Sequence, residues 1–176
     1  AAGERLYTRI RRAYLQLGQV VSPDDAALAL RGLRTLDIRL QRSAASALRI
    51  AEWLAGRPEV AQVLCPMLPG APGYETWART FTGGCGLFSV ILKGRDEAAR
   101  ARFIDALELF GIGYSWGGFE SLVVPVDPAG TRSATPWPPA GMASEDRYGV
   151  RLAIGLEDPV DLIADLAQAF DRMEGQ

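Results

Sequence analysis

Two stretches of sequence carry most of the information about this fold: residues 114–122, YSWGGFESL, and residues 150–158, VRLAIGLED. The first predicts a strand that enters a Gly-Gly turn. The second predicts an apolar strand with a single cation, Arg151, in its middle, followed by the start of a helix. Together they indicate a site for a small, anionic, amino-acid-like ligand.

Outward from these stretches, strands and helices alternate from residue 59 onward. We expect strands at residues 60–64, 86–93, 112–116, 121–126 and 150–156, and helices at residues 74–81, 96–110 and 158–173. The strands at 112–116 and 121–126 are expected to pair as a hairpin across Gly117-Gly118, and residues 127–148 to form a long loop. The pattern predicts an α+β fold, an antiparallel sheet with helices on one face.

Helical periodicity dominates the N-terminal part. Apolar residues at three-to-four spacing predict an amphipathic helix over residues 4–17. Ser22 and Pro23 begin a second helix, which the pattern extends through Leu54 and which would be about 50 Å long at 1.5 Å per residue. Because so long a helix often joins two domains, we expect residues 1–42 to be an arm that includes the first part of an inter-domain helix. Residues 43–176 are expected to form the compact domain.

Composition excludes several classes of site. The chain has 176 residues, a net charge of −2 and 48% hydrophobic residues, so we expect a globular protein with neither a nucleic-acid nor a membrane partner. It contains no histidine, which excludes Ser-His-Asp and Cys-His triads and His-ligated zinc from this chain. Cys65 and Cys85 have no metal-ligand spacing, and we interpret both as free thiols in a reducing cytoplasm.

Arg151 is the leading candidate for binding a ligand. Along its strand Val150, Leu152 and Ile154 point to one face, and Arg151 shares the other with Ala153 and Gly155. Two small neighbours would leave a hollow in which a guanidinium meets a carboxylate through two hydrogen bonds. The alternative is an exposed arginine with an internal acidic partner such as Glu157.

Ser115 and Trp116 stand just before the Gly-Gly turn, where side chains at strand ends often line pockets. Ser115 would donate a hydrogen bond and Trp116 would form the wall of an apolar slot. The alternative is a tryptophan in the core and a serine facing solvent. Lys93, the single lysine of the chain, ends a predicted strand, and we interpret it as a solvated residue without a catalytic role.

Several motifs resemble the C-terminal domain of the Cys/Met-metabolism enzymes that depend on pyridoxal phosphate (PLP), which have the type I fold of PLP enzymes. The stretches that carry this resemblance are SPDDA at 22–26, RGLRTL at 31–36, FTG at 81–83, GLFS at 86–89, and RL with IGLED at 151–158. Within that family, YSWGG with ESL is similar to the cystathionine β-lyase branch, whereas related γ-synthases and γ-lyases tend to have Ser-Leu-Gly-Gly there.

The resemblance implies specific roles for four residues. Arg151 would bind the α-carboxylate of the substrate, Ser115 would position the carboxylate or the lysine–PLP linkage, and Trp116 would line the substrate slot beside Tyr114. The implied reaction, in methionine biosynthesis, converts cystathionine to homocysteine, pyruvate and ammonia, with PLP as the electron sink. Family members assemble as homotetramers and act on small amino-acid substrates in the cytoplasm.

The family's Ser-x-Thr-Lys segment, which supplies the Schiff-base lysine, does not occur here. We therefore expect this chain to be the C-terminal part of such an enzyme, with no catalytic residue of its own and with PLP held mainly by a part that it lacks. Alone it is expected to be inactive. The alternative hypotheses are a stand-alone module that binds an amino acid and a module that docks on a full-length homologue.

Overall fold

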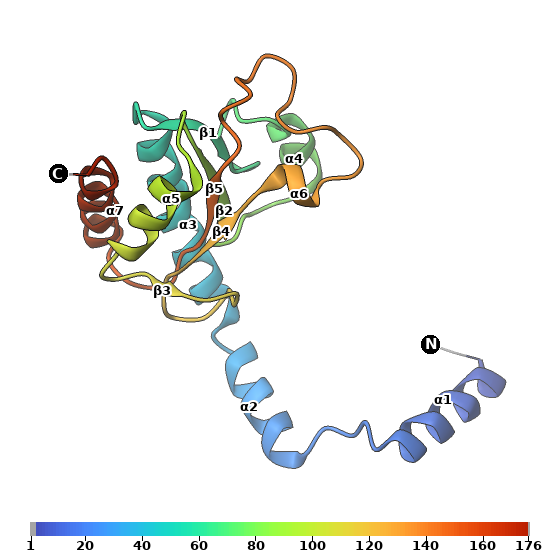
Figure 1. Cartoon of the computed structure of the whole chain (residues 1–176). Coiled ribbons are helices and arrows are strands. Elements are labelled where there is room, and N and C mark those ends of the chain that lie inside the picture. Colours follow the sequence, from blue (N-terminus) through green and yellow to red (C-terminus); the bar gives the residue numbers. More distant parts are fainter. Residues whose placement is uncertain (1–2, 176) are drawn as a thin grey trace. The chain divides into compact units, whose positions relative to one another are not determined.

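The computed structural model describes residues 3–175, and the chain divides into two units, Ala1–Asp37 and Ile38–Gln176. The first unit contains helix α1 (Glu4–Leu17) and helix α2 (Pro23–Leu33), drawn in blue in Figure 1. Both begin where the sequence predicts. Ser22 caps α2, because its Oγ accepts a hydrogen bond of 3.0 Å from the Asp25 N–H.

The prediction of one continuous helix from residue 22 to residue 54 is wrong. The helical pattern is interrupted at Arg34 and Thr35, and a separate helix, α3, spans Leu36–Ala55. At the interruption the Thr35 N–H donates to the Gly32 carbonyl, a turn bond rather than an α-helical one. Glycine and a β-branched residue near each other are poor helix formers, which weakens the helix at this point. The domain boundary between residues 42 and 43 stays a prediction.

The second unit is built on a five-stranded sheet with the order β1-β2-β5-β4-β3. Its strands are β1 (Val60–Leu64), β2 (Leu87–Leu92), β3 (Gly111–Ile112), β4 (Leu122–Val126) and β5 (Gly149–Ala153). Strand β5 pairs antiparallel with both β2 and β4, and β1 pairs antiparallel with β2. With its helices, this sheet confirms the predicted α+β class.

The predicted hairpin across Gly117-Gly118 is wrong, since β3 and β4 are parallel. The Gly111 N–H donates to the Ser121 carbonyl at 3.0 Å, and the Gly113 N–H donates to the Val123 carbonyl at 3.2 Å. Residues 113–121 therefore form a connecting loop rather than a hairpin turn, and this loop brings the chain back so that β4 runs in the same direction as β3. The sheet is mixed rather than fully antiparallel.

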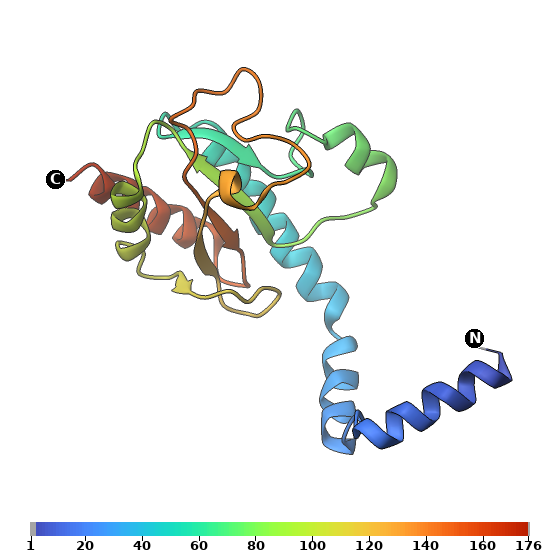
Figure 2. The same ribbon diagram turned by 45° about the vertical axis from the view of Figure 1, so that its right-hand side comes forward.

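Helices α3, α5 (Glu97–Asp105) and α7 (Pro159–Met173) cover one face of the sheet (Figure 2). The other side carries α4 (Tyr74–Thr80), the short helix α6 (Pro128–Thr131) and the remainder of the loop at 127–148 (Figure 1). The core lies between the sheet and the three covering helices. Its fully buried side chains include Ile50, Leu54, Phe103, Val123, Leu152, Leu162, Leu166 and Phe170.

Helix α5 ends at Asp105, five residues earlier than the sequence predicts. The cause lies on α7, where the buried Asp165 carboxylate accepts hydrogen bonds from the Glu108 and Leu109 N–H groups at 2.8–3.2 Å. These bonds replace the helical ones that the two amides would otherwise make. The segment before β3 is thus fixed by a contact between residues more than fifty positions apart.

The loop at 127–148 is tied at its base. Arg147 donates to Asp127 at 2.8 Å, and the Asp146 carboxylate accepts a hydrogen bond of 2.7 Å from the Gly94 N–H. The guanidinium groups of Arg100 and Arg147 lie 5.0 and 4.9 Å from the centre of the Tyr148 ring. These contacts hold both ends of the loop against the start of α5.

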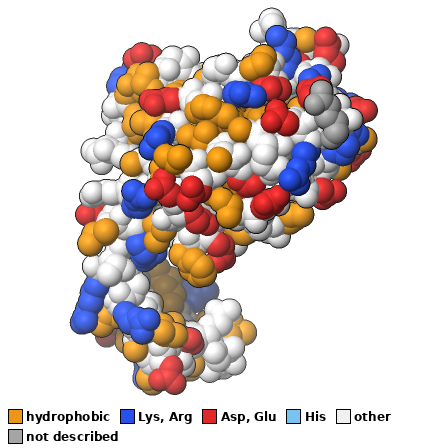
Figure 3. Space-filling model, turned by 90° about the vertical axis from the view of Figure 1, so that its left-hand side faces the viewer, with side chains coloured by type: hydrophobic (Ala, Val, Ile, Leu, Met, Phe, Trp, Pro, Cys, Tyr) orange, Lys and Arg blue, Asp and Glu red, His pale blue; other side chains and the backbone are white. Residues whose placement is uncertain are grey.

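Acidic and basic side chains are interspersed with apolar ones over the face drawn in Figure 3, which agrees with the small net charge. None of the helices within residues 3–175 is both long and apolar enough to cross a membrane.

Replacing Asp165 by alanine is expected to lower the free energy of unfolding by about 2–3 kcal/mol, since two backbone N–H groups lose a charged acceptor. Urea unfolding followed by far-UV circular dichroism measures this loss. The matched control is Asp171→Ala, an exposed carboxylate on the same helix, for which we expect a change within about 0.5 kcal/mol. Equal losses in the two variants would contradict the role of Asp165.

The hydrogen bond from Arg147, assisted by its charge, lowers the pKa of Asp127 below the ordinary value of 3.8. The ionised form therefore stabilises the folded chain fully above about that pH, and the contribution is lost as the pH falls through the lower, folded-state pKa. We expect Arg147→Gln to raise the pKa of Asp127 toward 3.8, as measured by the carboxyl ¹³C shift. Arg132→Gln, in the same loop, should leave it unchanged.

Candidate functional site

Arg151 lies in the middle of β5, opposite Ser89 on β2 and Val124 on β4. Its neighbours Val150 and Leu152 point into the core and are 1% and 0% exposed. Because side chains alternate along a strand, Arg151 points to the face opposite helices α3, α5 and α7, where it is half-buried. Strand β5, hydrogen-bonded to β2 and β4, thus holds this cation on the face of the sheet that carries α4, α6 and the 127–148 loop.

Three consecutive residues of the 113–121 loop surround the Arg151 guanidinium. Its Nη2 donates to the Tyr114 carbonyl at 2.6 Å and to the Ser115 carbonyl at 3.4 Å. The guanidinium carbon lies 5.3 Å from the centre of the Tyr114 ring and 5.5 Å from that of the Trp116 ring. The structure therefore brings all four predicted site residues together, with Ser115 contributing its backbone carbonyl.

The Nε of Arg151 is buried and lacks a hydrogen-bond partner. Within residues 3–175, no ion pair joins Arg151 to an acidic side chain. Glu157, which the sequence offered as an internal partner, is instead bonded to the N–H and Oγ of Ser121 at 2.7 and 2.8 Å. A buried donor on a charged group without a partner is unfavourable, so this edge of the guanidinium is suited to an anionic ligand.

The two aromatic side chains beside Arg151 are open to solvent, with Tyr114 78% and Trp116 63% exposed. The chain turns just after them at Gly117, whose φ of 77° lies in the left-handed region that glycine adopts readily. Two apolar walls therefore stand next to a cation on an accessible surface. That combination suits a ligand with an anionic end and an apolar or sulfur-containing chain.

The predicted hollow beside Arg151 is only partly present. A Cβ added to Gly155 would overlap the Phe119 carbonyl oxygen and lie 2.6 Å from the Glu120 carbonyl carbon. The backbone of the 113–121 loop thus fills the space over Gly155, and the glycine allows the loop to approach the strand closely. This packing, which involves Glu157 as an anchor of the loop, left no recognisable signal in the sequence.

Lys93 does not join this group. It follows β2 and lies four residues beyond Ser89, the residue opposite Arg151, which places it about 13 Å further along the strand at about 3.3 Å per residue. Its side chain is exposed. The residues around Arg151 therefore suit a carboxylate, but the single lysine of the chain does not lie where it would hold PLP beside that carboxylate.

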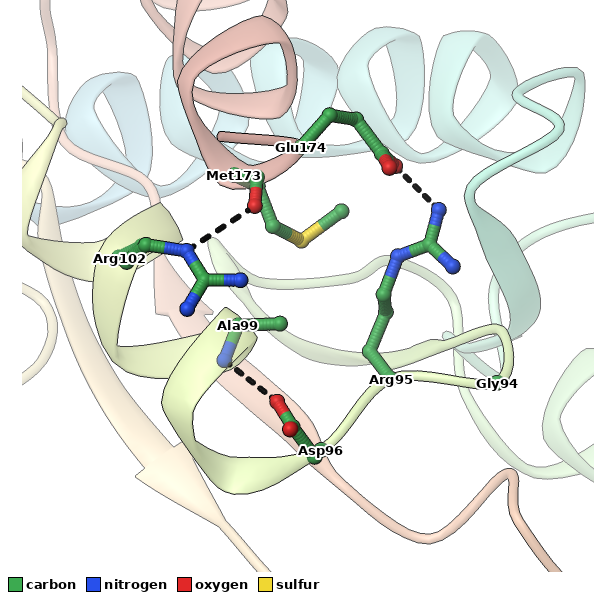
Figure 4. A pocket seen from close by; sticks show the side chains of 7 residues that line it. All are labelled: Gly94, Arg95, Asp96, Ala99, Arg102, Met173 and Glu174. Atoms are coloured by element: carbon green, nitrogen blue, oxygen red, sulfur yellow. Dashed lines mark hydrogen bonds and ion pairs between the residues drawn. The ribbon is translucent and has the colours of Figure 1, made fainter. Parts of the chain in front are cut away.

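A separate hollow of about 270 Å³ lies between the start of α5 and the end of α7 (Figure 4). Arg95 and Arg102 point into it, but each is engaged with the end of α7. Arg102 Nε donates to the Met173 carbonyl at 3.2 Å, and Arg95 pairs with Glu174. Cations near helix C-terminal carbonyls are stabilising. We therefore assign Arg95 and Arg102 a structural role, in which they hold the end of α7 against the start of α5.

Both cysteines are free thiols. Cys65 is buried, and burial raises the pKa of its thiol. Cys85 is exposed and lies at the edge of an apolar groove of about 370 Å³ together with Met67, Trp77 and Phe81. Neither thiol contacts the group around Arg151 in the interactions described above.

The chain is similar to known PLP enzymes. The model of the family described as Cys/Met metabolism PLP-dependent enzyme matches residues 1–171. Cystathionine β-lyase of Bordetella avium is 47% identical, covering 96% of this chain and 41% of the relative. Cystathionine β-lyase MetC of Escherichia coli strain K12 is 43% identical, covering 96% of this chain and 42% of the relative.

A solved structure has the same fold. It is cystathionine γ-synthase from Xanthomonas oryzae pv. oryzae in complex with aminoacrylate and cysteine, with 38% identity and a TM-score of 0.78 over 99% of this chain and 44% of that one. The chain thus spans about two fifths of the length of the relatives it matches. Because the family model covers residues 1–171 and these relatives align along almost all of it, the chain belongs to the Cys/Met-metabolism enzymes that depend on pyridoxal phosphate.

Proposed function

We propose that this chain is the C-terminal part of a PLP-dependent carbon–sulfur β-lyase, in which it supplies the arginine that binds the substrate carboxylate. The reaction proposed for the parent protein cleaves cystathionine to homocysteine, pyruvate and ammonia. Two relatives with cystathionine β-lyase activity in their names, at 47% and 43% identity, support this choice. The YSWGG motif at 114–118, similar to the β-lyase branch, supports it further.

The observation that carries the proposal is the buried Nε of Arg151, which has no partner. Side-on pairing of an arginine with a carboxylate uses Nε and Nη2, as Arg57 does with Glu59 in this chain at 3.1 and 2.8 Å. At Arg151 the Nη2 donates to the Tyr114 and Ser115 carbonyls, whereas the Nε has no partner within this chain. An α-carboxylate bound at Nε would give this charged donor an anionic acceptor.

Tyr114, Ser115 and Trp116 would complete the substrate site. The Ser115 and Tyr114 carbonyls orient the guanidinium, and the two exposed rings would line a slot for the sulfur-containing side chain of the substrate. The rings also stabilise the cation from its faces without neutralising it. The charge of Arg151 therefore remains available to a carboxylate.

PLP, when bound, withdraws electrons from the substrate and so makes cleavage of the carbon–sulfur bond possible. The residues around Arg151 do not include a lysine to hold it, and Lys93 follows β2, four residues beyond Ser89, the residue opposite Arg151. We therefore propose that PLP is held by another part of the parent protein, and that the 176-residue chain by itself is catalytically inactive.

We also propose that the parent protein is a cytoplasmic homo-oligomer. Apolar side chains on α1 and α2 support association with another chain: Leu6, Ile10 and Leu33 are among those that are 50–64% exposed. Exposed apolar surface of this kind usually contacts another protein surface.

The alternative is a stand-alone module that binds or docks without catalysis. One observation favours it: the carboxylate-binding edge of Arg151 and its two aromatic neighbours come from this chain alone. Such a module would bind a free amino acid with no need for PLP.

Arg151→Lys is expected to weaken the binding of L-methionine at least about tenfold, because an ammonium cannot bond both the loop carbonyls and a carboxylate in the planar geometry of a guanidinium. NMR titration of the chain measures this affinity, and L-methioninamide, which lacks the carboxylate, should bind the original chain as weakly. The control is Arg172→Lys, an exposed arginine on α7, which should bind L-methionine normally. An unchanged affinity in Arg151→Lys would refute the proposed role.

Incubation of the chain with PLP and L-cystathionine should yield no pyruvate above the rate of PLP alone, as a coupled lactate dehydrogenase assay would measure. Lys93→Arg should give the same result as the original chain. Pyruvate formation at an enzymatic rate that Lys93→Arg abolishes would show that this chain holds PLP productively, against our expectation.

A further inference from the structure

Ser121, Gly155 and Glu157, which we call the loop anchor, join the end of the 113–121 loop to the segment after β5. The Ser121 N–H and Oγ donate to the two Glu157 carboxylate oxygens at 2.7 and 2.8 Å. The Ser121 Oγ also accepts a hydrogen bond of 2.9 Å from the Gly155 N–H. The Ser121 hydroxyl thus both donates and accepts a hydrogen bond, and the residue is 0% exposed.

The loop anchor tolerates little displacement. The Leu156 N–H donates to the Phe119 carbonyl at 2.8 Å, and an added Cβ on Gly155 would lie 2.6 Å from Glu157 Oε2. At the other end of the loop, the Gly113 N–H donates to the Val123 carbonyl at 3.2 Å. The loop that carries the aromatic site residues is therefore fixed at both ends.

The same two segments hold the Arg151 site. Arg151 precedes Gly155 on β5 and its continuation, and the carbonyls that accept from its Nη2 belong to the anchored loop. Because a hydrogen bond weakens steeply with changes in distance and angle, the position of the loop relative to β5 sets the direction of the guanidinium.

The loop anchor also keeps Glu157 away from Arg151. Both carboxylate oxygens of Glu157 accept from Ser121, so this carboxylate is not an internal counterion for the nearby strand. Without Ser121, an uncommitted carboxylate two residues after Gly155 would compete with the substrate for the guanidinium.

We propose that Ser121 and Glu157 are positioning residues for substrate binding: they orient Arg151 through the 113–121 loop and leave its Nε without an acidic partner from this chain. The inference rests on the proposed role of Arg151 as the carboxylate-binding residue. It assigns a function to two side chains that do not touch the ligand.

The test uses Ser121→Ala and Glu157→Gln in the 176-residue chain, with two readouts. The first, without ligand, is the ¹H–¹⁵N NMR signal of the Arg151 guanidinium, assigned by its loss in Arg151→Lys. A guanidinium whose rotation is restricted by hydrogen bonds gives a resolved Nη2 signal. We expect this signal to broaden or shift in both variants. The second is the affinity for L-methionine, which we expect to fall on the order of tenfold, as for the loss of one hydrogen bond to a charged group.

Two controls separate positioning from general destabilisation. Glu120→Gln changes an exposed carboxylate next to the loop anchor and should leave both readouts unchanged. Glu59→Gln removes the charge that pairs with Arg57 in the segment before β1, and should lower the thermal midpoint without moving the Arg151 signal.

An unchanged Arg151 signal in both Ser121→Ala and Glu157→Gln would overturn the inference, as would the same change in Glu59→Gln. If the original chain has no affinity for L-methionine, the proposed role of Arg151 fails, and the ligand-free signals alone decide whether the loop anchor orients the guanidinium. Loss of order at Arg151 together with weaker binding in both variants supports the inference in full.

Discussion

The central position of β5 is the constraint on which the rest of the second unit depends. This strand is hydrogen-bonded along both edges, to β2 and to β4, so its backbone cannot shift register without breaking two ladders. With period-two alternation, one register places Val150 and Leu152 in the core and Arg151 on the opposite face. A slip by one residue would bury the guanidinium and expose the apolar pair.

Features that depend on neighbouring residues were predictable from the sequence. The cap at Ser22 and the start of α7 at Asp158-Pro159 follow from side chains that bond to amides two or three positions away. The alternation around Arg151 was equally visible. What the pattern could not supply is the contact of Asp165 with the amides of Glu108 and Leu109, which ends α5 early.

The candidate site likewise has features that the sequence predicts and features that it does not. Its four residues were recognisable from their types and from resemblance to a family, but the use of the Tyr114 and Ser115 carbonyls was not, because backbone groups have no signature in a sequence. The parallel pairing of β3 with β4 was missed for a related reason. A Gly-Gly pair between two apolar runs is typical of a hairpin, and the contact of Ser121 with the distant Glu157 lies outside that local pattern.

Because the 127–148 loop is tied at its base, the stability of the sheet depends little on the length of that loop. With Asp127 and Arg147 joined at 2.8 Å, the segment between them begins and ends at nearly the same place. The entropy of closing such a loop grows only slowly with its length, by about 0.6 kcal/mol for each doubling. This segment can therefore lengthen, shorten or receive a foreign sequence during evolution or engineering, while β4 and β5 on either side keep their register.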